Sequence, residues 1–129
     1  MNYTLEYLEK GSLVSADGIV KNEADLEMLM LKLDAEKYVN LCFVFSNQNI
    51  LTVSGGREQY IVMFSDNSKF YELNNPLNKG ADLIPIRTGH TVGKFPQELV
   101  MDPFTTLNVI KEFYHSGKRH SDFNWKPLN

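Results

Sequence analysis

The middle of the chain consists of a series of short β-prone runs. Each run is rich in β-branched, aromatic and aliphatic residues, and Asn, Gly, Ser and Pro separate it from the next. The runs cover residues 38–45, 50–54, 59–65, 69–73 and 82–87. Near the N-terminus, Tyr3, Leu5 and Tyr7 alternate with polar residues, as in a half-buried strand. The sequence therefore predicts an antiparallel meander sheet of about five to six strands.

The separators predict particular turns. Ser54-Gly55-Gly56-Arg57 fits a tight hairpin, because consecutive glycines readily adopt the positive φ values of a primed turn. Asp66-Asn67-Ser68 predicts a second turn, and residues 74–80 predict a longer surface loop. Pro85 lacks a backbone N–H group, so its strand is expected at a sheet edge or at a bulge.

Two segments have the spacing of amphipathic helices, and the first is expected over residues 23–35. Asn22 precedes it as a capping residue, and acidic side chains follow in the first turn, where exposed amides and the helix dipole favour them. Its apolar residues recur at i, i+3, i+4 and i+7 as Leu26, Leu29, Met30 and Leu33. Because Met28 and Leu31 widen this stripe, we expect much of the helix to be covered.

The second helix begins at Asp102, with Pro103 at the first helical position and Gly117 able to close it in a left-handed conformation. Its apolar face is expected to carry Phe104, Leu107, Ile110 and Tyr114, flanked by Val109 and Phe113. The pattern predicts an α+β fold in which a helix from the N-terminal half and a C-terminal helix pack on the sheet. No repeat or linker interrupts the chain, so residues 1–129 are expected to form a single domain.

Composition limits the class of protein. The chain has 129 residues, of which 43% are hydrophobic, as in a soluble domain with one core. A net charge of −3 does not favour direct binding of nucleic acid and suits a basic partner better. The N-terminal residues show neither a basic leader nor an apolar span, so we expect a cytoplasmic protein without a membrane segment. Cys42 lies in an apolar run and is expected to be an inert core thiol.

No group of residues has the spacing of a catalytic or metal site. His90, His115 and His120 lack a ligand pattern, and Cys42 has no second cysteine to join it, so no metal is expected. No serine lies in a nucleophile elbow. We therefore expect a protein that is not an enzyme and uses no cofactor. The alternatives are a small ligand-binding or enzymatic α+β domain with a pocket between helix and sheet, and a nucleic-acid-binding module.

The C-terminal segment carries a more specific pattern. It consists of Phe113, Gly117, Arg119, Phe123 and Trp125, preceded by Phe95-Pro96 and by Asp102. This order resembles the immunity protein 1 family of bacterial polymorphic toxin and contact-dependent inhibition systems, over roughly residues 40 to 127. The family often has proline directly after the arginine, where this chain has His120.

The resemblance implies an immunity protein that binds and neutralises a cognate cytosolic toxin domain by stoichiometric occlusion. Such toxins are commonly nucleases or nucleic-acid deaminases, and the partner would be encoded by the neighbouring gene. A basic toxin cleft would attract an acidic inhibitor and thereby accelerate their association.

Two sets of residues follow from this interpretation. The structural signature is expected to fold the C-terminus onto the sheet, with Trp125 burying a large area and Arg119 paired with a carboxylate; its members are Asp102, Phe113, Gly117, Arg119 and Trp125. The toxin contacts are expected from polar and aromatic residues of the strands and loops. These are Glu58, Asp66, Lys69, Tyr71, Glu72 and Asp82.

Overall fold

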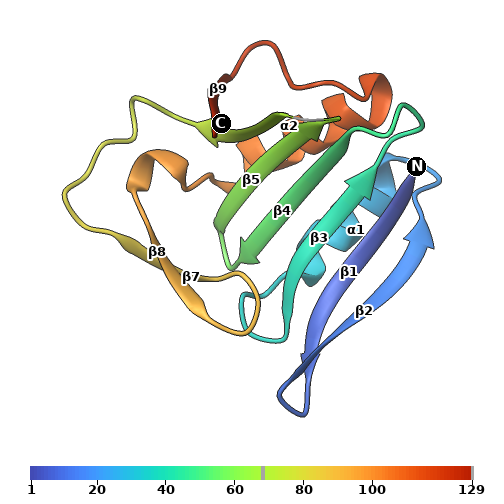
Figure 1. Cartoon of the computed structure of the whole chain (residues 1–129), viewed down its shortest axis with the longest axis horizontal. Helices are drawn as coiled ribbons and strands as arrows, with labels where there is room; N and C mark the ends of the chain where they lie inside the picture. The colour runs from blue at the N-terminus through green and yellow to red at the C-terminus, as the bar shows by residue number, and fades with distance from the viewer. Residues whose placement is uncertain (68, 129) are drawn as a thin grey trace.

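One large antiparallel sheet organises the fold. The computed structural model describes residues 1–67 and 69–128, and Figure 1 shows the course of the chain. Within these residues the sheet has seven strands. In spatial order they are β2 (Ser12–Ile19), β1 (Asn2–Glu9), β3 (Tyr38–Val44), β4 (Ile50–Gly56), β5 (Gln59–Asp66), β6 (Lys69–Asn74) and β9 (Asn124–Pro127). The predicted α+β meander is confirmed, and β2 and β9, which the sequence did not single out as strands, form its two edges.

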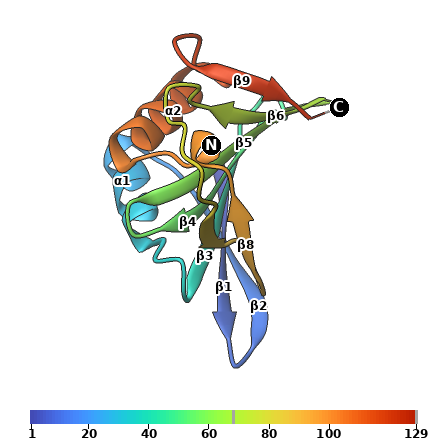
Figure 2. The same ribbon diagram turned by 90° about the vertical axis from the view of Figure 1, so that its left-hand side faces the viewer.

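The two faces of the sheet are covered differently. The helices α1 (Glu23–Lys32) and α2 (Pro103–Ser116) lie on one face, as Figure 2 shows. A separate two-stranded sheet, β7 (Ile84–Arg87) and β8 (Val92–Phe95), lies on the other side and is followed by the short 3-10 helix η1 (Gln97–Leu99). Asn40 of β3 donates a hydrogen bond to the Thr88 carbonyl at 3.1 Å, which ties this hairpin to the main sheet. Pro85 therefore lies in an edge strand, as predicted.

Alternation along the strands sends one set of side chains toward the helices. In β3, Val39, Leu41 and Phe43 are fully buried, whereas the residues between them are only half-buried. Cys42 belongs to the half-buried set, so its expected place in the core is wrong. The apolar run around Cys42 predicts a strand that is buried on both faces, but helices cover only one face of the sheet.

The first helix is shorter than predicted. Its Asn22 cap is confirmed, because the Asn22 side chain accepts a hydrogen bond from the Asp25 N–H at 3.0 Å. The helix ends at Lys32 rather than at residue 35, since Leu33 turns to an extended conformation with ψ of 119°. The predicted core face is buried, but Met28 and Leu31 are 63% and 76% exposed and do not widen it.

A loop held by Asp34 follows α1. The Asp34 carboxylate accepts hydrogen bonds from the backbone N–H groups of Glu36, Lys37 and Tyr38 at 2.9–3.0 Å. Burial alone would raise the pKa of this carboxyl, but the three donors stabilise its charged form, and the pKa lies below its ordinary value. The side chain thus supplies the acceptor that the turn into β3 needs.

The hairpin between β4 and β5 differs from the prediction. The turn residues with positive φ are Arg57 and Glu58, at 54° and 73°. Gly55 and Gly56 lie within β4 instead. A side chain at Gly56 would meet the backbone of the loop after α1, which forms a bridge to it through Asp34. Close approach of two backbones therefore explains the glycine there. The second predicted turn contains Ser68, which lies outside the described residues.

The second helix begins and ends as predicted. The Asp102 carboxylate accepts from the Thr105 N–H at 2.6 Å, Pro103 is the first helical residue, and Gly117 closes the helix with φ of 68°. The buried face is rotated from the predicted one: it carries Thr106, Val109, Ile110 and Phe113. Phe104 is 77% exposed and does not belong to the core. Of the helices in the described chain, none has the length and apolar character that crossing a membrane requires.

Side chains also join the two helices to each other. Glu23 of α1 receives a hydrogen bond from His115 Nε2 at 2.7 Å, and this contact lowers the pKa of the Glu23 carboxyl. Lys111 lies 3.4 Å from Glu27. The pairs are exposed, so they fix the relative position of the helices more than they stabilise the fold.

Gly117→Ala should destabilise the protein more than Gly11→Ala does. Both glycines have positive φ, but a methyl group at Gly117 would overlap the Phe45 ring, whereas the space at Gly11 is open. We expect a loss of about 1 kcal/mol for Gly11→Ala from backbone strain, and about 2–4 kcal/mol for Gly117→Ala. Urea unfolding of both variants measures the difference. Equal losses would show that Phe45 does not hold the turn.

Candidate functional site

The chain reverses direction at Gly117, and this reversal builds the site. The Gly117 N–H group donates to the Phe113 carbonyl at 2.8 Å. Its own carbonyl accepts hydrogen bonds from the side-chain amides of Asn49 and Asn47, at 2.9 and 3.3 Å. The end of α2 is thereby attached to the turn between β3 and β4, and residues 118–123 are directed back toward the sheet.

Strand β9 then places Trp125 beside the sheet core. Trp125 pairs with Leu73 of β6, and its ring makes an edge contact with Phe64 at 6.0 Å between centroids. The Trp125 indole N–H donates to the His120 carbonyl at 3.1 Å. The side chain is half-buried and packs against the hydrophobic core. One side of the indole supports the fold and the other is open to solvent.

Arg119 stacks on aromatic rings. Its guanidinium carbon lies 3.8 Å from the centroid of the Tyr71 ring and 5.8 Å from that of Phe64. Both distances are within the range of a cation–π interaction. The sequence-based expectation of a carboxylate partner is wrong: among residues 1–67 and 69–128, no acid forms an ion pair with Arg119. The quadrupoles of the rings take the place of an anion.

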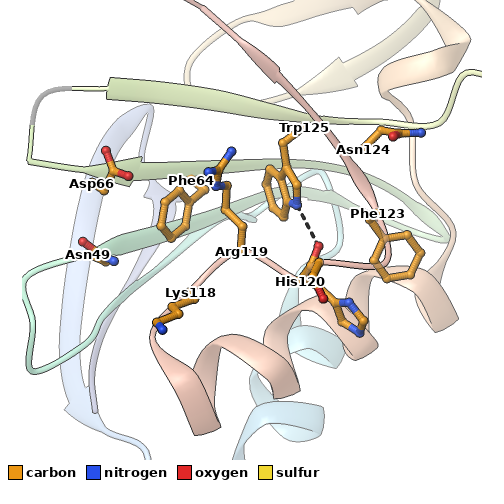
Figure 3. Close-up of a pocket in the computed structure, with 10 residues that line it drawn as sticks. Asn49, Phe64, Asp66, Lys118, Arg119, His120, Phe123, Asn124 and Trp125 are labelled. Atoms are coloured by element: carbon orange, nitrogen blue, oxygen red, sulfur yellow. Dashed lines mark hydrogen bonds between the residues drawn. The ribbon is translucent and has the colours of Figure 1, made fainter.

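These residues surround an open cavity of about 470 Å³, which Figure 3 shows and which we call the C-terminal groove. Its lining consists of Asn49, Phe64, Asp66, Lys118, Arg119, His120, Ser121, Phe123, Asn124 and Trp125. The walls come from the end of β5, the turn after β3, the segment after α2, and β9. Segments far apart in the sequence therefore meet here.

The charges in the groove are unevenly distributed. Lys118 and Arg119 are neighbours on one wall, and within the described chain neither forms an ion pair. Asp66 is the acidic residue of the lining and lies across from them in Figure 3. His120 accepts a hydrogen bond from the Asp122 N–H through Nδ1 at 3.2 Å, and its ring packs on Phe123. The groove is thus cationic in a protein whose net charge is negative.

Three of the predicted toxin contacts either line the groove or adjoin a residue that lines it. Asp66 lines it, and Lys69 is its cross-strand partner. Tyr71 lies under the Arg119 guanidinium. The structure thus brings these three residues together with Arg119 and Trp125 of the structural signature.

The other three predicted contacts lie elsewhere. Glu58 is in the turn at the opposite end of β5 from the groove. Asp82 is exposed in the segment before β7. Glu72 has Met63 and Lys126 as its cross-strand neighbours, and Phe64 and Tyr71 flank these positions on the helix side, so Glu72 faces away from the helices. The six residues therefore do not form one surface.

Several groove residues carry no sequence signal that would have identified them. Asn49 and Ser121 have the sequence context of ordinary turn residues, and the reversal of the chain places both in the lining of the groove. Phe64 has the alternation of a core strand residue, which it also is, at 2% exposure. Lys118 and His120 stand beside the signature arginine, and that adjacency was the available clue.

A second cavity of about 420 Å³ adjoins the groove and shares Phe123 and Asn124 with it. Leu73, Pro76, Leu77 and Met101 make its lining largely apolar. The Asn74 Oδ1 atom, at the same place, is buried without a hydrogen-bond partner in the described structure. No cluster of three His, Cys, Asp or Glu side chains that could hold a metal ion occurs in the described parts of the chain.

No protein-family model matches the chain, and no curated protein shows significant similarity to it.

Trp125→Ala should destabilise the protein less than Phe113→Ala does. Phe113 is fully buried, and its truncation is expected to cost about 3–5 kcal/mol. Trp125 is half-buried, so we expect Trp125→Ala to lower the free energy of unfolding by about 2 kcal/mol. Trp125→Phe should lower it by about 1 kcal/mol, because it removes the hydrogen bond to the His120 carbonyl. Denaturant unfolding tests the order. A loss for Trp125→Ala equal to that for Phe113→Ala would identify Trp125 as a core residue.

Proposed function

We propose that the protein is an immunity protein, which binds a cognate cytosolic toxin domain encoded by the neighbouring gene and neutralises it by stoichiometric occlusion. The observation that supports this most is the half-exposed array of Arg119, Tyr71 and Trp125 at the C-terminal groove. The resemblance of the C-terminal pattern to immunity protein 1 supplies the type of partner. The proposed place of action is the cytoplasm, where such toxins act.

The array has the properties of a binding hot spot. Trp, Tyr and Arg are the residue types that contribute most to protein–protein affinity, and they do so when they are held rigidly before binding. Here the Tyr71 ring fixes the guanidinium plane, and the His120 carbonyl fixes the indole. A partner would therefore lose little side-chain entropy from this side of the interface.

Asp66 and Lys69 extend the proposed interface along the ends of β5 and β6. Both can hydrogen-bond a partner at the rim of the groove, where polar contacts set orientation. The net charge of −3 acts at longer range, because it favours approach of a basic toxin domain. The cationic groove and the acidic remainder of the surface thus have separate roles in the proposal.

The second candidate is a small ligand-binding or enzymatic domain. The cavity volumes of about 470 and 420 Å³ favour it, because they fall within the range of small-molecule sites. This candidate predicts that some metabolite raises the melting temperature in the absence of any protein partner.

The proposal is tested by co-expression with the protein encoded by the neighbouring gene. We expect the native chain to co-purify with that protein and to protect the cells that produce it. Arg119→Ala and Tyr71→Ala should each weaken the complex about 30-fold, which corresponds to the loss of a hot-spot residue. Titration calorimetry measures the dissociation constants, and melting temperatures show whether each variant is folded.

Glu58→Ala and Asp82→Ala serve as matched controls, because both side chains are exposed and lie away from the groove. They should change the dissociation constant less than about threefold. The absence of a complex at micromolar concentrations, together with unprotected cells, would disprove the immunity function. Loss of binding in the two controls and not in the groove variants would place the interface elsewhere.

A further inference from the structure

The Arg119 side chain has donors without acceptors. It is half-buried in the wall of the groove, and within residues 1–67 and 69–128 its guanidinium makes no hydrogen bond or ion pair. Its described partners are the faces of Tyr71 and Phe64. Stacking satisfies the face of a guanidinium but leaves its five N–H groups, which lie in the plane, free to donate.

The stacking also fixes the direction of these donors. A carbon-to-centroid distance of 3.8 Å places the guanidinium directly on the Tyr71 ring. The N–H groups therefore form a rigid fork at the edge of the guanidinium, beside the cavity that Figure 3 shows. A fork of this kind matches the two oxygens of a planar carboxylate in a bidentate pair.

The charge of the groove selects among anions. Lys118 and Arg119 contribute two positive charges, and Asp66 contributes one negative charge. The resulting single positive charge balances a carboxylate, whereas the charge of a phosphate dianion would exceed it, and Asp66 would repel the dianion more strongly than the carboxylate. The net charge of −3 also disfavours a polyanion such as nucleic acid.

We propose that the C-terminal groove is a carboxylate-binding site, and that its occupant is an Asp or Glu side chain of a partner protein. Arg119 binds the carboxylate in bidentate fashion, and Lys118 adds a second positive charge. Trp125, which is half-buried and lines the groove, contacts the methylene groups of the bound side chain and the apolar residues beside it. The identification of that partner as the toxin domain rests on the proposed function, whereas the chemistry of the site does not.

The site can be tested on the free protein. The probes are the blocked peptide acetyl-Leu-Glu-Leu-amide, its glutamine counterpart acetyl-Leu-Gln-Leu-amide, and inorganic phosphate. Nuclear magnetic resonance follows the Trp125 indole N–H and the Arg119 Nε–H during each titration. We expect saturable shifts with the glutamate peptide, and an affinity about tenfold lower for the glutamine peptide, as for the loss of one charge-assisted hydrogen-bond pair. Phosphate should bind more weakly than the glutamate peptide.

Variants distinguish the contribution of the bidentate Arg119 geometry to peptide affinity from the contribution of net charge. Arg119→Gln should lower the affinity for the glutamate peptide about tenfold, and Arg119→Lys should restore only part of it, because lysine keeps the charge but not the bidentate geometry. Lys94→Gln makes the same change in net charge at an exposed position of β8 and should have little effect. Asp66→Asn should increase the affinity about two- to threefold by removing a like charge.

Three results would overturn the proposal. The first is that the two peptides bind with equal affinity or that neither binds. The second is that phosphate binds more tightly than the glutamate peptide, and the third is that Lys94→Gln and Arg119→Gln lower the affinity for that peptide equally. The outcome is independent of the toxin. A peptide that fails to bind while the complex forms would disprove the carboxylate site alone. A peptide that binds while no complex forms with the neighbouring gene product would disprove the immunity function alone.

Discussion

The left-handed turn at Gly117 is the constraint on which the site depends. Its conformation ends α2, and its carbonyl accepts hydrogen bonds from the side-chain amides of Asn47 and Asn49, which hold the chain in the direction in which it leaves the helix. That direction leads to β9, which completes the edge of the sheet beside β6. Without this turn, Arg119 would not reach Tyr71. A local backbone requirement thus creates a contact between residues that are far apart in the sequence.

The elements that were predicted correctly are those whose signals are local. Asp102, Pro103 and Gly117 define α2 through capping, a permitted proline and a left-handed end, each of which acts within one turn of the helix. The central strands also carry their own alternation and turn residues. Strand β9 has neither; it exists because Trp125 pairs with Leu73 after the chain has reversed. Contacts of that kind depend on tertiary structure, so a pattern in the sequence does not reveal them.

The candidate site was predicted only in part, for a related reason. Arginine is ordinarily assigned a carboxylate partner, but here the cross-strand neighbours Phe64 and Tyr71 present a double aromatic surface to it. The sequence predicts that the signature residues Arg119 and Trp125 fold the C-terminus onto the sheet, and the structure gives them that role while leaving one side of each open. Glu58 and Asp82 share acidity with Asp66 but not its location. The sequence shows which residue types are present, and the fold determines which of these residues lie close together.

The proposed surface by which the protein contacts its partner is the C-terminal groove. Trp125 is the only tryptophan of the chain and lines this groove, so its signal can directly detect contact between the groove and the partner. Incorporation of 5-fluorotryptophan gives a single fluorine resonance, which can be followed as the unlabelled partner encoded by the neighbouring gene is added. We expect a new, shifted resonance at a one-to-one ratio. An unchanged resonance in a complex that demonstrably forms would contradict the proposal.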